Sequence, residues 1–195
     1  IEDDALTASG QLDITDADAG SAFFEATTIS GAHGSLTITP DGSWSYTADN
    51  AQPAVQGLGE GQFLTDTVTV TSLDGTEQSI EVTITGTNDV PFISGELSGS
   101  VTEDEAVDAN GDLVASGQLA ITDADEGEAF FRSETVTGAH GSLTITPDGE
   151  WTYEVDNDLP AVQSLGAGDT VTDTVTVTSV DGTTQDIEIT ITGTN

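Results

Sequence analysis

An internal repeat constrains this chain more than any other feature of its sequence. Residues 10–88 align with residues 117–195 without a gap, at an offset of 107 residues, and 56 of the 79 aligned positions are identical. A period of this length is typical of tandem domains, because the units of stacked solenoids are much shorter. We therefore expect two domains of one fold, residues 1–88 and residues 89–195.

A twenty-residue stretch within the repeat predicts a β-hairpin. GAHGSLTITPDGSWSYTADN at residues 31–50 returns as GAHGSLTITPDGEWTYEVDN at residues 138–157. Leu36 and Ile38 alternate with polar residues, a Pro-Asp-Gly turn follows, and Trp44 then alternates with serines on the return. Because an isolated hairpin is marginal in water, the rest of each repeat must cover its apolar face.

Further alternating segments bring the count to about seven strands in each repeat. TDTVTVTS occurs at residues 65–72 and 172–179 and leads through an Asp-Gly turn into another alternating run. PAVQ, which occurs twice, predicts one helical turn with proline first. The Phe-Phe pairs at 23–24 and 130–131 are expected in the core. This pattern predicts an all-β fold with two tandem immunoglobulin- or cadherin-like β-sandwich domains.

The two copies differ at their N-terminal ends. The second copy contains Gly95–Leu113, where Leu97 and Val101 suggest a first strand, whereas the first copy has only Ile1–Leu6. We expect that the first copy lacks this strand and has an open sheet edge. No signal peptide opens the chain, and we expect neighbouring tandem repeats of the same polypeptide on both sides of it.

The charge of the chain restricts its partners. It has 1 Lys or Arg against 36 Asp and Glu, which gives a net charge of −35. Such a charge repels nucleic acid and acidic membrane surfaces, and no apolar run is long enough to insert into a membrane. A compact fold with this charge requires counter-ions, of which divalent cations are the most efficient. Cysteine is absent, so the hydrophobic core and bound metal must stabilise the domains.

Several acidic turns of the second copy are expected at the junction between the copies, because the strands of a sandwich alternate in direction. Oxygen ligands expected to converge there are Asn88, Asp89, Asp123, Asp125 and, in an Asp-Gly turn, Asp181. Ca²⁺ takes six to eight oxygen ligands, whereas Mg²⁺ demands stricter geometry. The sequence thus predicts one or more Ca²⁺ ions between the domains. The alternative is a solvated acidic loop end.

Several motifs in order carry a resemblance to a known family. They are VTED at 101–104, ITDAD, GxLTIxPDGxWxY, DTVTVTSxDGT and ITGTNDxP. With these motifs the chain resembles the bacterial VCBS repeat, a cadherin-like domain of giant secreted RTX adhesins. The resemblance implies a β-sandwich, type I secretion, display at the bacterial cell surface and calcium at the junctions of tandem domains.

The resemblance also implies roles for individual acids. It assigns Asn88 and Asp89 to the linker and Asp123 and Asp125 to the D-x-D element. Glu103 and Asp104 resemble the cadherin glutamate element, although strand counting does not clearly place them at the junction. The matching acids of the first copy are Glu2, Asp3, Asp16 and Asp18, and Asp74 is the counterpart of Asp181; we expect that site to be half built because the upstream linker is missing.

Other candidate residues favour structural roles. His33 and His140 occupy one repeat position, so we interpret them as parts of a turn. Trp44 and Trp151 would form a carbohydrate-stacking strip if they were exposed, but aromatic residues that alternate with Ser and Thr favour the core. Pairs of acids occur in glycoside hydrolases, yet these pairs recur in repeats without cleft-forming insertions, and there is no GxSxG element. We therefore expect no enzymatic activity.

Three hypotheses for function follow. The leading one is a non-catalytic stalk, in which Ca²⁺ at the junction stiffens extender repeats of a secreted surface adhesin that supports cell adhesion or biofilm formation. The alternative is a module that binds a glycan or a protein through an exposed face and needs Trp44 or Trp151 in solvent. A third is homophilic pairing through the open edge of the first copy.

Overall fold

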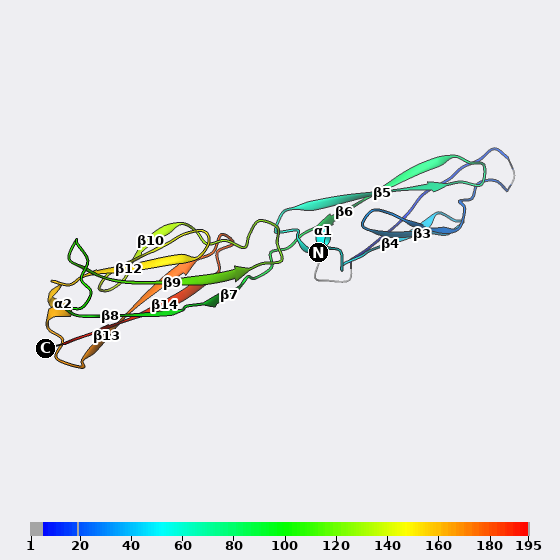
Figure 1. Cartoon of the computed structure of the whole chain (residues 1–195). Helices are drawn as coiled ribbons and strands as arrows, with labels where there is room; N and C mark the ends of the chain where they lie inside the picture. Colours follow the sequence, from blue (N-terminus) through cyan, green and yellow to red (C-terminus); the bar gives the residue numbers. More distant parts are fainter. Residues whose placement is uncertain (1–5, 19, 195) are drawn as a thin grey trace. The chain divides into compact units, whose positions relative to one another are not determined.

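The protein is almost entirely β-structure (Figure 1). The computed structural model describes residues 6–18 and 20–194. The chain divides into two compact units, Ile1–Asp89 (unit 1) and Val90–Asn195 (unit 2). The predicted all-β fold is confirmed. Within the described residues, no helix has the length and hydrophobicity needed to cross a membrane.

Unit 1 contains six strands and one helical turn among its described residues. They are β1 (Thr7–Gln11), β2 (Thr27–Ser30), β3 (Gly34–Ile38), β4 (Ser43–Ala48), α1 (Pro53–Gln56), β5 (Phe63–Thr71) and β6 (Glu77–Thr85). One sheet has the order β1-β4-β3-β2, and the other contains β5 and β6. The predicted hairpin is β3–β4, in which Leu36 pairs with Tyr46 and Ile38 with Trp44.

Unit 2 repeats this arrangement with two additional strands. Its elements are β7 (Phe92–Gly95), β8 (Ser98–Thr102), β9 (Asp112–Thr122), β10 (Glu134–Thr137), β11 (Ser142–Ile145), β12 (Glu150–Asp156), α2 (Pro160–Gln163), β13 (Thr170–Thr178) and β14 (Thr184–Thr192). The sheets have the orders β10-β11-β12-β9-β7 and β13-β14-β8. The additional strands β7 and β8 come from the segment that has no aligned counterpart in the first copy.

The two sheets of unit 2 enclose one hydrophobic core, as expected for a sandwich. Trp151 and Tyr153 of β12 are fully buried against Ile187 and Ile189 of β14. Phe131 is also buried, but its neighbour Phe130 is 44% exposed. Each Phe-Phe pair thus supplies one core residue and not two, because adjacent residues of an extended chain point to opposite faces.

The alternation of β13 carries one acidic residue into the interior. Asp173 has the same parity as Val175 and Val177, and all three are buried between exposed threonines. Its carboxylate accepts a hydrogen bond from the Tyr153 hydroxyl at 2.8 Å. It also accepts three backbone N–H bonds of 2.7 to 3.0 Å, from Ala139, His140 and Gly141. The carboxylate therefore ties the loop before β11 to the opposite sheet.

Unit 1 repeats this contact. Asp66 accepts hydrogen bonds from the Tyr46 hydroxyl and from the backbone N–H groups of Ala32 and His33. The imidazole Nδ1 of His33 lies 3.2 Å from Gln52 Oε1. The duplicated histidine thus belongs to a loop that is held at its backbone by a buried carboxylate.

Asp173 and Asp66 stay ionised because of these hydrogen bonds. Burial by itself raises the pKa of Asp173, but the N–H groups of His140, Gly141 and Ala139 and the Tyr153 hydroxyl outweigh it and lower the pKa. The pKa of Asp66 is lowered against burial in the same way. A buried carboxylate is stabilising only when such donors satisfy it.

Replacing Asp173 with Asn should lower the free energy of unfolding of unit 2 by about 1.5–3 kcal/mol at neutral pH, because charge-assisted hydrogen bonds are lost. Urea unfolding followed by tyrosine and tryptophan fluorescence measures this. The matched control is Glu188→Gln, which removes an exposed carboxylate from β14.

The difference in free energy of unfolding between wild type and Asp173→Asn should depend on pH, which gives an independent check. The folded pKa of Asp173 lies below the unfolded value of about 3.9, so its stabilisation is present above that pH and disappears as the pH falls through the folded pKa. The stabilities of wild type and Asp173→Asn should therefore converge below about pH 4. A difference that is constant from pH 7 to pH 3 would contradict this role of the carboxylate.

Candidate metal-binding site

Acidic residues gather at the end of unit 2 where the chain enters it. Phe92 at the start of β7 pairs with Thr122 at the end of β9, so the loop after β9 lies at this N-terminal end. Asp123 Oδ1 accepts the backbone N–H of Asp125 at 3.0 Å, and Asp125 is 2% exposed. Asp123 Oδ2 is buried and has no hydrogen-bond partner among the described residues. The D-x-D element thus holds two carboxylates in a tight turn, with Asp125 buried and Asp123 half-buried.

Glu128 is a further member of this group that sequence reasoning missed. Its pKa is raised by burial and by the negative charges of Asp125, Asp123 and Asp181. These four residues therefore form one electrostatically coupled acidic cluster. The signal was the run DADEGE at 123–128, whose last acid is replaced by Ser21 in the first copy.

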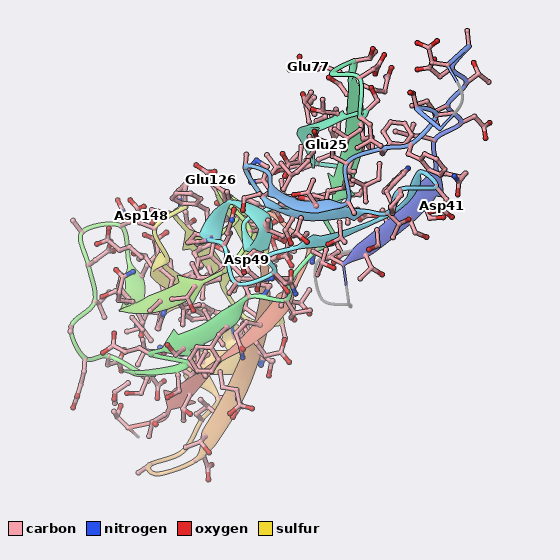
Figure 2. All side chains as sticks on the ribbon, turned by 90° about the vertical axis from the view of Figure 1, so that its right-hand side faces the viewer. Glu25, Asp41, Asp49, Glu77, Glu126 and Asp148 are labelled. Atoms are coloured by element: carbon pink, nitrogen blue, oxygen red, sulfur yellow. The ribbon has the colours of Figure 1, made fainter. Side chains whose placement is uncertain are left out.

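Asp181 occupies the β13–β14 turn and also organises it. Its carboxylate accepts hydrogen bonds from the Ser179 hydroxyl and from the backbone N–H and hydroxyl of Thr183, the latter two at 3.1 and 2.9 Å. Asp148, at the tip of the β11–β12 hairpin, and Glu126 are exposed near the same loops, and Figure 2 labels both among the carboxylates that cover the molecule. The N-terminal end of unit 2 is thus rich in oxygen ligands.

Asn88 and Asp89 lie between the last strand of unit 1 and the first strand of unit 2. The side-chain amide of Asn88 donates to the backbone carbonyl of Asp89 at 2.7 Å, and Asn88 itself is exposed. They lie in the segment that joins the two units, because β6 ends at Thr85 and β7 begins at Phe92. Their part in metal binding remains a prediction.

Glu103 and Asp104 lie at the other end of unit 2, so they do not join Asp123 and Asp125 in one site. β8 runs parallel to β14 and pairs Thr102 with Thr192, which places Glu103 at the C-terminal end. Strand counting missed this because a parallel pair between distant segments is not visible in the sequence pattern.

The environment of Glu103 nevertheless resembles that of Asp123. Glu103 is fully buried, its Oε2 accepts the backbone N–H of Thr194 at 3.0 Å, and its Oε1 has no hydrogen-bond partner in the described part of the chain. Asp104 adopts a positive φ of 59° and exchanges hydrogen bonds of 3.0 and 2.9 Å with the side chain of Asn157. The two ends of unit 2 therefore each contain a carboxylate with one buried oxygen that has no hydrogen-bond partner among the described residues.

The acids of unit 1 are more exposed. Asp16 Oδ1 accepts the N–H of Asp18 at 2.7 Å, as in the second copy, but Asp18 is exposed whereas Asp125 is buried. Asp74 accepts hydrogen bonds from Ser72 and Thr76, which lower the pKa of its carboxyl group. Glu2 and Asp3 fall outside the described residues.

The aromatic strip is a core feature and not a binding surface. Trp151 and Tyr153 are fully buried, and Tyr46 is 1% exposed. Trp44 is half-buried and packs against the core of unit 1. A glycan-stacking module requires a tryptophan in solvent. Trp151 does not meet this requirement, and Trp44 meets it only in part.

The two ends of unit 2 fit a hard divalent cation in ligand chemistry, although the described side chains do not complete a coordination sphere. Buried, unsatisfied carboxylate oxygens at Asp123 and Glu103 are costly unless a cation neutralises them. The described residues contain no group of three or more His, Cys, Asp and Glu arranged to hold a metal ion. A Ca²⁺ ion at either end would therefore need further ligands from backbone carbonyls, amides or water.

Comparison with known proteins identifies the family. A family model described as bacterial cadherin-like domain matches residues 1–86 and again residues 88–193. The chain belongs to the bacterial cadherin-like domain family. This confirms the resemblance to cadherin-like adhesin repeats that the motifs suggested. Bacterial cadherin-like domains are structural units and not enzymes, in agreement with the expectation for this chain.

Proteins similar to these bacterial cadherin-like domains include a lectin, a protocadherin and a bacterial adhesin. The calcium-binding lectin RapA2 of Rhizobium johnstonii is 28% identical over 164 residues, which cover 77% of this chain and 66% of that protein. A protocadherin gammaB7 structure shares the fold, with a TM-score of 0.54 and 18% identity over 98% of this chain and 44% of that chain. A Ca²⁺-stabilised adhesin with which an Antarctic bacterium binds ice is 19% identical, with a TM-score of 0.27, and covers 95% of this chain and 42% of its own.

Replacing Glu128 with Gln should stabilise unit 2 in the presence of a chelator. The substitution removes one of four mutually repelling carboxylates, which we expect to raise the free energy of unfolding by about 1 kcal/mol or less at low ionic strength. Thermal unfolding in EDTA at low and high NaCl measures the gain, which salt should reduce. The matched control is Glu126→Gln, an exposed neighbour. An equal gain in both variants would contradict a coupled cluster.

Proposed function

We propose that the chain is a pair of calcium-binding extender repeats of a secreted bacterial cell-surface adhesin. Membership of the bacterial cadherin-like family and similarity to a calcium-binding lectin support the proposal. The observation that carries it is the acidic cluster of Asp123, Asp125, Glu128 and Asp181, one of whose oxygens is buried without a hydrogen-bond partner among the described residues. In this function the repeats carry a distal adhesive region away from the cell and perform no chemistry.

The residues of the N-terminal end have distinct roles in this proposal. Asp123 and Asp125 supply carboxylate oxygens from a turn that their own hydrogen bond pre-forms, and Glu128 adds a third negative charge. Asn88 and Asp89 provide oxygens from the segment that joins the units and leads into β7, whose first residue pairs with the end of β9. Ca²⁺, when bound, supplies the positive charge that offsets the repulsion among these groups. Because the ligands come from both sides of the crossing, binding restricts how one repeat follows the next.

Glu103 and Asp104 belong to a second, separate site in this proposal. Glu103 occupies the C-terminal end of unit 2, where its unsatisfied Oε1 requires a cation of its own. A repeat with such a site at each end is suited to tandem assembly, since every junction between neighbouring repeats would receive acids from both partners. Neighbouring tandem repeats are therefore the partners that we propose.

A direct adhesive function is the second candidate, and the described similarity to a lectin is what favours it. The strip of aromatic residues offers little support, because only Trp44 is partly accessible. Glycan binding that is abolished by Trp44→Ala, with unchanged calcium affinity, would favour this candidate over the stalk.

Calcium titration by calorimetry should distinguish a built site from general charge attraction. At physiological NaCl we expect saturable binding that Asp123→Asn with Asp125→Asn weakens by about tenfold or more, because two of the carboxylate ligands become neutral. The repeat supplies a matched control of equal charge change, Asp16→Asn with Asp18→Asn, which should leave this binding event in place. An equal loss of calcium affinity in both double variants would contradict the site. A heat of calcium binding to the wild type that vanishes on adding salt would contradict it as well.

A further inference from the structure

A tight turn follows β8 at the C-terminal end of unit 2. The backbone N–H of Glu105 donates to the Thr102 carbonyl at 3.2 Å, which closes a four-residue turn. Asp104, the third residue of this turn, has a φ of 59°. Residues with a Cβ adopt this left-handed conformation at a cost, because Cβ crowds the following carbonyl oxygen. The sequence thus places an aspartate where a turn with a positive φ favours glycine or asparagine.

The side chain of Asn157 holds this aspartate. Asn157 directly follows β12 and is 8% exposed. Its Oδ1 accepts the backbone N–H of Asp104 at 3.0 Å, and its Nδ2 donates to Asp104 Oδ1 at 2.9 Å. One buried amide therefore fixes both the backbone and the side chain of the residue whose conformation is costly, and both of its polar atoms are satisfied.

The backbone of Asn157 is itself held by two other parts of unit 2. Its N–H donates to the carbonyl of Gly111, which precedes β9, at 3.0 Å. Its carbonyl accepts the side-chain amide of Gln163, the last residue of α2, at 3.0 Å. The side chain that contacts Asp104 thus extends from a backbone that is fixed by hydrogen bonds to both neighbours.

The same turn carries the buried Glu103. The backbone N–H of Glu103 donates to the Thr192 carbonyl at 2.8 Å, and its Oε2 accepts the N–H of Thr194 at 3.0 Å. Its Oε1 is buried and has no hydrogen-bond partner among the described residues. Because Glu103 and Asp104 are the two central residues of one turn, the conformation of Asp104 sets how the chain leaves Glu103.

We propose that Asn157 is a positioning residue for the C-terminal calcium site and acts on Glu103 through the left-handed backbone of Asp104. The inference rests on the proposed function, in which Glu103 supplies a carboxylate to Ca²⁺. Asn157 keeps the turn closed before the metal arrives, so the buried carboxylate is already in place when Ca²⁺ binds. Hydrogen-bond partners of metal ligands raise metal affinity in this way without contacting the ion.

Substitutions of Asp104 test the role of its backbone. Glycine and alanine both lack the carboxylate, but only glycine adopts a positive φ without strain. Calcium affinity is measured by calorimetry on the whole chain carrying Asp123→Asn and Asp125→Asn, so that the C-terminal site dominates the heat. We expect Asp104→Ala to bind Ca²⁺ about tenfold more weakly than Asp104→Gly, and Glu103→Gln to weaken binding by about tenfold or more.

Substitution of Asn157 tests the clamp itself in the same background. Asn157→Ala should weaken calcium binding about tenfold, and this loss should largely disappear when Asp104→Gly is also present, because glycine no longer needs to be held. The matched control is Asn50→Ala at the same repeat position of unit 1, where Oδ1 accepts Gln56 Nε2 at 3.2 Å. Each titration is run well below the melting temperature of its variant, so that unfolding does not contribute.

Amide hydrogen exchange in chelator tests the turn without metal. The amides of Glu105 and Thr194 report on the turn and on the carboxylate of Glu103, to which they donate. Asn157→Ala should speed exchange at both amides relative to those of β14, and Asn50→Ala should not. Adding Asp104→Gly should reverse the change, which a general loss of stability would not do.

Equal calcium affinity of Asp104→Gly and Asp104→Ala would overturn the inference, since the left-handed conformation would then have no effect on the site. Unchanged affinity or unchanged exchange in Asn157→Ala would overturn it as well. If Glu103→Gln weakens calcium binding in these cases, the proposed site stands and only the positioning role fails. If Glu103→Gln has no effect, the C-terminal site fails and the inference fails with it.

Discussion

Repulsion among carboxylates is the constraint on which the rest of this structure depends. The chain contains 36 acidic residues and one cation, Arg132, whose guanidinium donates to the backbone carbonyl of Val180 at 3.3 Å. Internal ion pairs cannot balance such a composition. Backbone N–H groups and hydroxyls satisfy some carboxylates, as at Asp173, and this requires no cation. At the two ends of unit 2, one buried carboxylate oxygen of Asp123 and one of Glu103 have no hydrogen-bond partner among the described residues, and the proposed cations would neutralise them.

Comparison of the two copies distinguishes carboxylates satisfied by hydrogen bonds from the acidic cluster at the end of unit 2. Asp66 and Asp173 both accept hydrogen bonds from a tyrosine hydroxyl and from the backbone N–H groups of the Ala-His pair, which marks this contact as part of the fold itself. The D-x-D turn is also duplicated, but only the second copy buries its second aspartate and adds Glu128. The same backbone thus carries a permanent, hydrogen-bonded carboxylate in its interior and a variable, charge-dependent cluster at its end.

Much of the fold could be predicted from the sequence, because alternation with a period of two specifies which residues are buried. The burial of Asp173 could also have been recognised, since it shares the parity of Val175 and Val177. The location of Glu103 could not be predicted, because it depends on the parallel pairing of segments about ninety residues apart. Glu128 was missed because it lies in a loop, where no periodicity reports on burial.

These features together describe a chain whose end-to-end geometry should depend on divalent cations, and small-angle X-ray scattering measures this most directly. In millimolar Ca²⁺ we expect a longer maximum dimension and a narrower distribution of shapes than in chelator, because the proposed junction site would take ligands from both units. The variant Asp123→Asn with Asp125→Asn should give the chelator profile in both conditions. Identical wild-type profiles with Ca²⁺ and with chelator would contradict the account.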